Sequence, residues 1–179
     1  MPGSERRKSI TRTIRIDAEN ETALITEAER RGYSVNALIG NVIERYLNSL
    51  RYNESAGMIS FSSETLQGLI KNLEKDTIRV MGEETGGSMV ASNLMQRGRK
   101  VNYENVVWYI TKVLGEYNGW FRCDYNVLED KQSFHLTHVM GYNWSVFLES
   151  YLKSVFDEVL GIKLNSVIMN NAVNLEVRK

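Results

Sequence analysis

The sequence predicts an α+β protein that consists of two domains. Residues 1–50 combine one short alternating run with two helical patterns, and residues 62–179 combine helical patterns with two pairs of alternating runs. Apolar residues at three- and four-residue spacing indicate helices, whereas alternation at every second residue indicates strands. Residues 51–61, "RYNESAGMISF", show neither period and are interpreted as a linker.

The composition is that of an ordinary globular chain. Its 179 residues, 42% hydrophobic and 25% charged, suit one large domain or two small ones. No apolar run approaches the roughly 18 residues of a membrane span, and the start "MPGSERRKSITRT" lacks the apolar stretch of a signal peptide. A single cysteine, Cys123, excludes an internal disulfide. We therefore expect a cytoplasmic protein with no membrane partner.

The charge is unevenly distributed along the chain. The net charge is zero, yet residues 1–16 carry five basic side chains against Glu5, so this arm holds +4 and the remainder holds −4. The basic side chains are Arg6, Arg7, Lys8, Arg12 and Arg15. A basic arm of this kind can meet phosphate groups, and the alternative is a solvated tail.

The run "TRTIRI", residues 11–16, alternates as a strand does. Its two faces are Ile10, Arg12, Ile14 and Ile16 on one side, and Thr11, Thr13 and Arg15 on the other. A single strand of six residues is not stable alone, and no hairpin partner follows it. The nearest candidate partner is the same strand of a second copy.

Two helices are expected after this strand. Asp17 is a suitable N-cap for the first helix, and Gly32 is suited to end it. Ser34 is then the expected N-cap of the second helix. The second helix carries an apolar stripe at Val35, Leu38, Ile39, Val42, Ile43, Tyr46, Leu47 and Leu50. Two such stripes cannot both be buried within about 40 residues of one chain, which predicts an intertwined dimer.

This order of elements resembles the ribbon-helix-helix family of DNA-binding proteins. The residues that carry the resemblance are "TRTIRI", the capped first helix and "RGYSVNALIGNVIERYL", within residues 9–50. The resemblance implies a two-stranded antiparallel ribbon, with one strand from each subunit, that lies in the DNA major groove.

The resemblance also implies roles for individual residues. Thr11, Thr13 and Arg15 would point at base edges, with Arg15 able to bind a guanine, while Ile14 and Ile16 would enter the dimer core. The backbone N–H groups at Ser34, Val35 and Asn36 would hold a phosphate. Further phosphate or minor-groove contacts would come from Arg6, Arg7 and Lys8, with Arg12 counted among the DNA-binding residues.

The second domain begins with helical patterns. A helix is expected from Ser62 or Ser63 and is predicted to end at "GGS", residues 86–88, while "MVASNLMQRGRKV" is ambiguous. Another helix is expected over 103–117, with Val106, Ile110, Val113, Leu114 and Tyr117 buried. "RGRK", residues 97–100, is interpreted as a solvated loop, with a second phosphate contact as the alternative.

Strands and one long helix complete the second domain. Two strands are expected around "EDKQ", followed by a helix capped by Asn143 and closed by Gly161, and then two strands around Asn170–Asn171. Val173, Leu175 and Val177 alternate in the last strand. We expect an antiparallel sheet with helices on one face.

Cys123, His135 and His138 are the candidate metal ligands, because some regulators join a ribbon-helix-helix domain to a metal-sensing α+β domain. Two histidines three apart on one strand would face opposite sides, so only one could join Cys123, and the other could coordinate only across a subunit interface. We expect no metal and no cofactor. The favoured interpretation is one histidine on the sheet surface and one buried in a hydrogen bond. The dense aromatic residues between Trp108 and Tyr151 are interpreted as core, with a small-molecule pocket as the alternative.

Catalytic motifs are lacking: "GEETGGS" is not a P-loop, and no serine elbow or HExxH occurs. We therefore expect a non-enzymatic, sequence-specific transcriptional regulator, in the manner of a repressor. Its partners would be double-stranded DNA and a second copy, as a homodimer or a tetramer. The alternatives are a metal- or small-ligand-responsive sensor, and an antitoxin-type protein that binds DNA and a protein partner.

Overall fold

The computed structural model describes residues 10–129 and 131–178 of the chain. The chain divides into two compact units between Glu44 and Arg45, six residues before the domain boundary expected after residue 50. Within the described ranges, no helix combines the length and the apolar character needed to cross a membrane.

Both helices predicted for the first domain are present, and the second ends one residue beyond the boundary at Glu44. α1 (Ala18–Arg31) follows Asp17 and ends at Gly32, which has a φ of +68° that suits a residue without a β-carbon. α2 (Val35–Arg45) is capped by Ser34, whose Oγ accepts a hydrogen bond from the Ala37 backbone N–H at 3.2 Å. The cap prediction for Ser34 is confirmed, whereas the Asp17 side chain makes no cap hydrogen bond.

Residues 10–17 carry no regular secondary structure in the single chain. This range includes the strand expected over 11–16, whose predicted pairing involves a second copy. Arg6, Arg7 and Lys8 lie outside the described residues.

The helical residues do not end at Leu50. η1, a π-helical segment (Tyr46–Leu50), and α3 (Arg51–Ser55) follow α2 directly, and Gly57 with a φ of +64° stands after them. The first five residues of the expected linker are therefore helical, and the irregular connection runs from residue 56 to residue 62.

Two helices occupy the region after this connection. α4 (Ser63–Ile70) is capped by Ser62, and α5 (Lys75–Gln96) runs unbroken through Gly86 and Gly87. The prediction that "GGS" ends a helix is therefore wrong. The physical reason is close packing, because a β-carbon at Gly82, Gly86 or Gly87 would meet atoms of α7 or of the segment that follows it.

The remaining elements agree with the expected order. α6 (Tyr103–Trp108) and η2 (Tyr109–Tyr117) cover the predicted helix, and its five apolar residues are all buried. The strands are β1 (Arg122–Val127), β2 (Lys131–Thr137), β3 (Asn165–Met169) and β4 (Ala172–Arg178), and α7 (Tyr142–Ser154) with η3 (Val155–Val159) lies between the two hairpins. Gly161 has the positive φ of a helix end.

Asn143 corrects one detail of this region. The residue before α7 is Gly141, and Asn143 lies in the first turn of the helix instead of capping it. Its amide donates hydrogen bonds to the carbonyl oxygens of Ile70 at 2.8 Å and Leu73 at 3.1 Å. Asn143 thus satisfies carbonyl groups at the end of α4.

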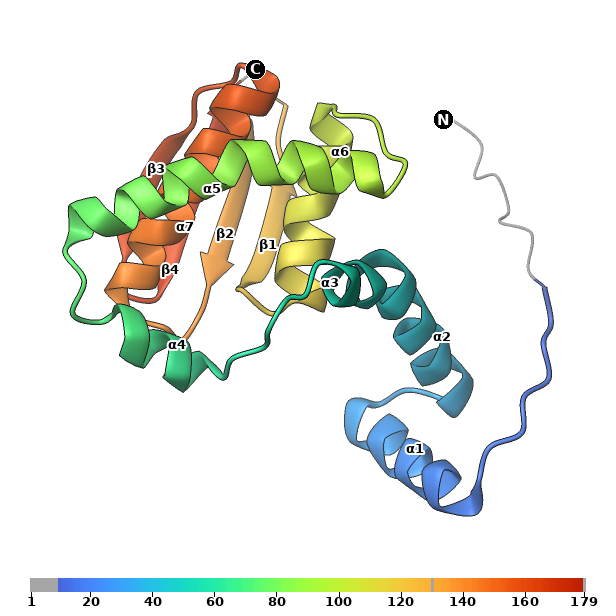
Figure 1. Cartoon of the computed structure of the whole chain (residues 1–179). Helices are drawn as coiled ribbons and strands as arrows, with labels where there is room; N and C mark the ends of the chain where they lie inside the picture. The colour runs from blue at the N-terminus through green and yellow to red at the C-terminus, as the bar shows by residue number, and fades with distance from the viewer. Residues whose placement is uncertain (1–9, 130, 179) are drawn as a thin grey trace. The chain divides into compact units, whose positions relative to one another are not determined.

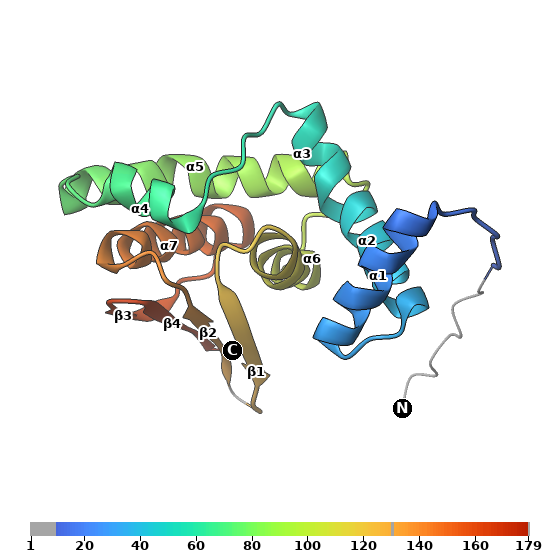
Figure 2. The same ribbon diagram turned by 90° about the horizontal axis from the view of Figure 1, so that it is seen from below.

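The described strands form one antiparallel sheet in the order β1-β2-β4-β3. α7 packs on one face of this sheet and α5 packs on the far side of α7, which gives three layers (Figures 1 and 2). Phe134, Leu136, Val173, Leu175 and Val177 point into the core, whereas Asp124, His135 and Asn174 lie side by side on the opposite face. The predicted α+β class, with helices on one face of an antiparallel sheet, is confirmed for this unit.

Candidate functional site

The arm before α1 presents polar and apolar side chains to solvent. Thr11, Arg12, Thr13 and Arg15 are exposed. Ile10 is 71% exposed and Ile14 is 60% exposed, while Ile16 is half-buried. The two isoleucines are large apolar side chains without cover in the single chain.

The start of α2 provides backbone donors. Ser34 uses its Oγ to accept from Ala37, and its carbonyl oxygen accepts from the Leu38 N–H at 2.9 Å. The first amides of a helix have no intrahelical acceptor, so the N–H groups of Val35 and Asn36 point out of the helix end. This end attracts anions because the helix dipole places partial positive charge there.

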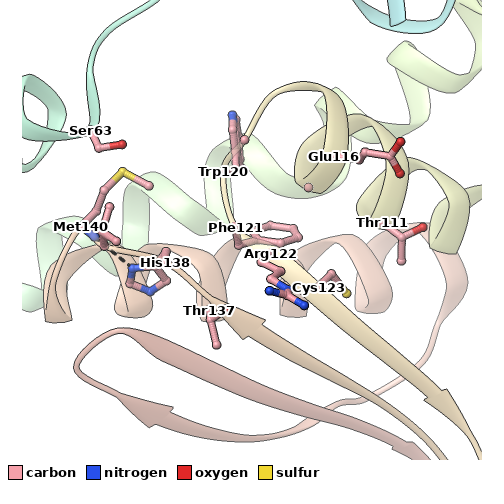
Figure 3. A pocket seen from close by; sticks show the side chains of 13 residues that line it. Ser63, Thr111, Glu116, Trp120, Phe121, Arg122, Cys123, Thr137, His138 and Met140 are labelled. Atoms are coloured by element: carbon pink, nitrogen blue, oxygen red, sulfur yellow. Dashed lines mark hydrogen bonds between the residues drawn. The ribbon is translucent and has the colours of Figure 1, made fainter. Parts of the chain in front are cut away.

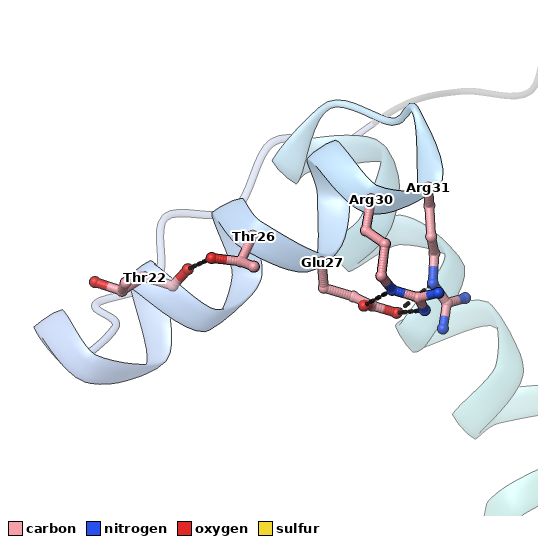
Figure 4. A network of polar contacts seen from close by, with 5 residues as sticks. All are labelled: Thr22, Thr26, Glu27, Arg30 and Arg31. Atoms are coloured by element: carbon pink, nitrogen blue, oxygen red, sulfur yellow. Dashed lines mark hydrogen bonds and ion pairs between the residues drawn. The ribbon is translucent and has the colours of Figure 1, made fainter.

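The last turn of α1 holds a charged network (Figure 4). Glu27 accepts hydrogen bonds from Arg30 at 2.7 Å and from Arg31 at 2.5 Å. The hydrogen bonds from Arg30 and Arg31 lower the pKa of Glu27 to about 2, so the carboxylate stays charged. One carboxylate thus neutralises the charge of one of the two arginines. This reduces the positive charge that the turn presents to a phosphate.

The basic cluster "RGRK" is bound into the second unit. Arg97 donates to the Asn48 carbonyl oxygen at 3.0 Å and stacks over the Tyr52 ring at 4.1 Å. Arg99 lies over the Trp108 ring at 3.6 Å. Both arginines therefore hold neighbouring segments, and the description of the whole cluster as a solvated loop is wrong for these two residues.

Cys123, His135 and His138 do not come together as one metal site. Cys123 pairs with Leu136 in the sheet register and points toward the helices, so His135 lies on the opposite face. There the Nδ1 of His135 is 2.5 Å from the Asn174 Oδ1. Among the described residues, no group of three or more His, Cys, Asp or Glu side chains could hold a metal ion.

His138 lies beyond the end of β2 and contacts a buried serine. Its Nε2 is 2.9 Å from the Ser145 Oγ, and its Nδ1 accepts the Met140 backbone N–H at 3.3 Å. Because Nδ1 is an acceptor, the neutral ring carries its proton on Nε2 and donates to Ser145. His138 therefore cannot act as a base toward this serine. Burial also lowers the pKa of His138 to about 4.

Cys123 and His138 line one cavity of about 500 Å³ beside the first strand (Figure 3). Burial, with the charge of Asp124 second, raises the pKa of the Cys123 thiol to about 11. A nucleophilic cysteine needs a lowered pKa, so this pair lacks the activation expected of a catalytic thiol.

The aromatic side chains mainly build the core. Trp120 and Trp144 meet edge to face at 5.6 Å between ring centroids, and Trp144 stacks on Phe147 at 4.8 Å. Tyr109, Phe121, Phe134 and Tyr151 are buried. The interpretation as core is confirmed for these four and for Trp144, while Trp120 and Phe121 also line the cavity of Figure 3.

A polar bridge that the sequence did not reveal lies within the second unit. The buried Ser49 of η1 donates to the Asn118 Oδ1 at 2.6 Å, and the Asn53 amide donates to the same oxygen at 3.3 Å. Asn118 is more than 60 positions away from both partners in the sequence, so no local pattern could identify the contact.

Neither a protein-family model nor a curated protein matches the chain.

Proposed function

We propose that the chain is a sequence-specific DNA-binding regulator that works as a homodimer. The observation that carries the proposal is the uncovered apolar surface of the first unit. Within residues 10–44, Ala28 and Leu38 are the buried hydrophobic residues, whereas Val42 is 54% exposed and Ile43 is 52% exposed. A unit of this size with so little buried apolar surface needs a partner to be stable.

A second copy would cover this surface through the arm. Two copies of residues 10–16, paired antiparallel, would direct Ile10 and Ile14 toward the helices, and Thr11, Thr13 and Arg15 away from them. A two-stranded ribbon fits the major groove. Arg15 would read a guanine through two hydrogen bonds, and the threonines would contact a thymine methyl group or a base edge.

Phosphate contacts would fix the ribbon in the groove. The amides of Val35 and Asn36 at the start of α2 suit one phosphate on each half-site. The arginines and lysine of residues 6–12 would neutralise further phosphates, so binding should weaken steeply as salt concentration rises.

The test is selection of binding sites from random double-stranded DNA by the full chain. We expect an enriched sequence that binds roughly 1,000-fold more tightly than random DNA. Arg15→Ala should reduce this ratio by roughly tenfold or more while the dimer mass is retained. Arg122→Ala, which removes an exposed arginine from β1, should leave the ratio unchanged.

Two results would contradict the proposal. The first is the absence of any enriched sequence, and the second is an unchanged discrimination ratio in Arg15→Ala.

A further inference from the structure

A second cavity, of about 420 Å³, lies within the second unit and adjoins the one beside Cys123. Residues from η1 and α3, the connection 58–62, α4 and the end of η2 line it. Its lining is mixed: Leu50, Leu66, Trp120, Met140 and Trp144 are among its apolar residues, and Ser60, Ser62 and Ser63 are among its polar ones. Its volume is in the usual range for small-molecule sites.

Two opposite charges also line this cavity. Arg45 and Glu54 are exposed, and neither side chain forms an ion pair or a hydrogen bond with another described residue. Asn53 and Asn118 also line the cavity, and the Asn53 amide donates to the Asn118 Oδ1 at 3.3 Å. The lining thus combines one cation, one anion and amide groups with apolar side chains.

We propose that this cavity binds a free α-amino acid with an apolar or aromatic side chain. Arg45 would take the carboxylate, because a guanidinium matches carboxylate geometry, and Glu54 would take the ammonium group. The side chain would lie among Leu50, Trp120 and Met140. A fatty acid or a nucleotide would leave Glu54 facing an anion, and an apolar amine would leave Arg45 facing a cation, so a zwitterion fits both charges best.

Occupancy would act on the helix that leads to the DNA-binding unit. Arg45 is the last residue of α2, and Leu50 belongs to η1, where the neighbouring Ser49 contacts Asn118. An amino acid held by Arg45 would therefore stabilise one position of the carboxyl end of α2. This regulatory consequence rests on the proposed function, whereas the binding does not.

Isothermal titration calorimetry of the full chain without DNA tests the binding. The probes are L-leucine, L-methionine, L-phenylalanine and L-tryptophan, followed by the N-acetyl and the carboxamide forms of the tightest binder. We expect at least one probe to bind with a Kd below about 1 mM, and each blocked form to bind roughly tenfold more weakly.

Charge-neutralising variants assign the binding to the cavity. Arg45→Gln and Glu54→Gln should each raise the Kd roughly tenfold or more. Lys71→Gln and Glu64→Gln, which change exposed residues outside the cavity lining, should leave it unchanged. Absence of binding by all four amino acids, or a Kd that survives Arg45→Gln or Glu54→Gln, overturns the proposal.

The two proposals fail separately. A chain that binds an amino acid but selects no DNA sequence overturns the proposed function alone. A chain that selects DNA but binds none of the four probes overturns this inference alone.

Discussion

Gly82 of α5 faces the backbone of α7 at Phe147, and a β-carbon on Gly82 would lie 2.8 Å from the Phe147 carbonyl oxygen. The same β-carbon would lie 2.9 Å from the Ser150 Cβ. Neither the carbonyl oxygen nor the helix that carries it can move aside without disturbing the core. The spacing of α5 and α7 therefore depends on the missing side chain.

Gly82→Ala is expected to destabilise the protein by about 1–2 kcal/mol. Overpacking in a core costs about 1–3 kcal/mol, and the better helix propensity of alanine returns up to about 1 kcal/mol. Gly68→Ala is the matched control, because a β-carbon at Gly68 of α4 meets nothing within 4 Å. That control should be neutral or stabilising in urea denaturation, and equal effects of the two substitutions would contradict the packing argument.

Ile14→Asp is expected to abolish the proposed dimer. A carboxylate in place of an isoleucine at the covered face of the ribbon would bury a charge without a partner. Sedimentation analysis at micromolar concentration should give the monomer mass for the variant and the dimer mass for the wild type. Val127→Asp serves as the control, since Val127 is 58% exposed on β1. If Ile14→Asp also sediments with the dimer mass, the assigned face of the ribbon is wrong.

His138 is expected to make stability depend on pH between about 6.5 and 4. Burial lowers its pKa in the folded chain to about 4, so the unfolded chain binds a proton that the folded chain does not bind. The stability that His138 contributes is therefore complete above about pH 6.5 and is lost as pH falls.

Between pH 7 and pH 5, protonation of His138 is expected to lower the free energy of unfolding by about 1 kcal/mol, with allowance for its partial exposure to solvent. His138→Gln should remove this difference in urea denaturation measured at both pH values, and His135→Gln should retain it. A pH difference of the same size in His138→Gln and in the wild type would refute the assignment.

Cys123 is expected to react slowly with iodoacetamide. Its raised pKa of about 11, against an ordinary value of 9.0, reduces the thiolate fraction at neutral pH by roughly 100-fold. Because the chain has one cysteine, mass spectrometry follows this site alone. The rate should continue to rise roughly tenfold per pH unit beyond pH 9. A plateau near pH 9 would show an unperturbed thiol.

Local patterns predicted the hairpins and most helices. The alternation of Val173, Leu175 and Val177 was readable because one face of β4 is buried. Gly86 and Gly87 were misjudged because glycine disfavours an isolated helix, whereas close packing against α7 and η3 favours this one. The four-residue spacing of Gly82 and Gly86 was the available signal for two closely packed helices.

The candidate sites also differ in whether their residues are close together in the sequence. Thr11, Thr13 and Arg15 could be chosen from the sequence because their alternation is local. The cavity of Arg45 and Glu54 could not, since Trp120 and Met140 join its lining from distant parts of the chain. Asn143 was misassigned because its amide bonds the end of α4, about 70 positions earlier.

The strand order β1-β2-β4-β3 has a consequence for folding kinetics. Each hairpin joins neighbours in the chain and can close within microseconds. The central pairing of β2 with β4 brings together Phe134 and Leu175, which are 41 positions apart, and α7 lies between them in the sequence. We expect this central pairing to limit the folding rate, so that truncation of Phe134 or Leu175 slows refolding more than a change in either hairpin turn.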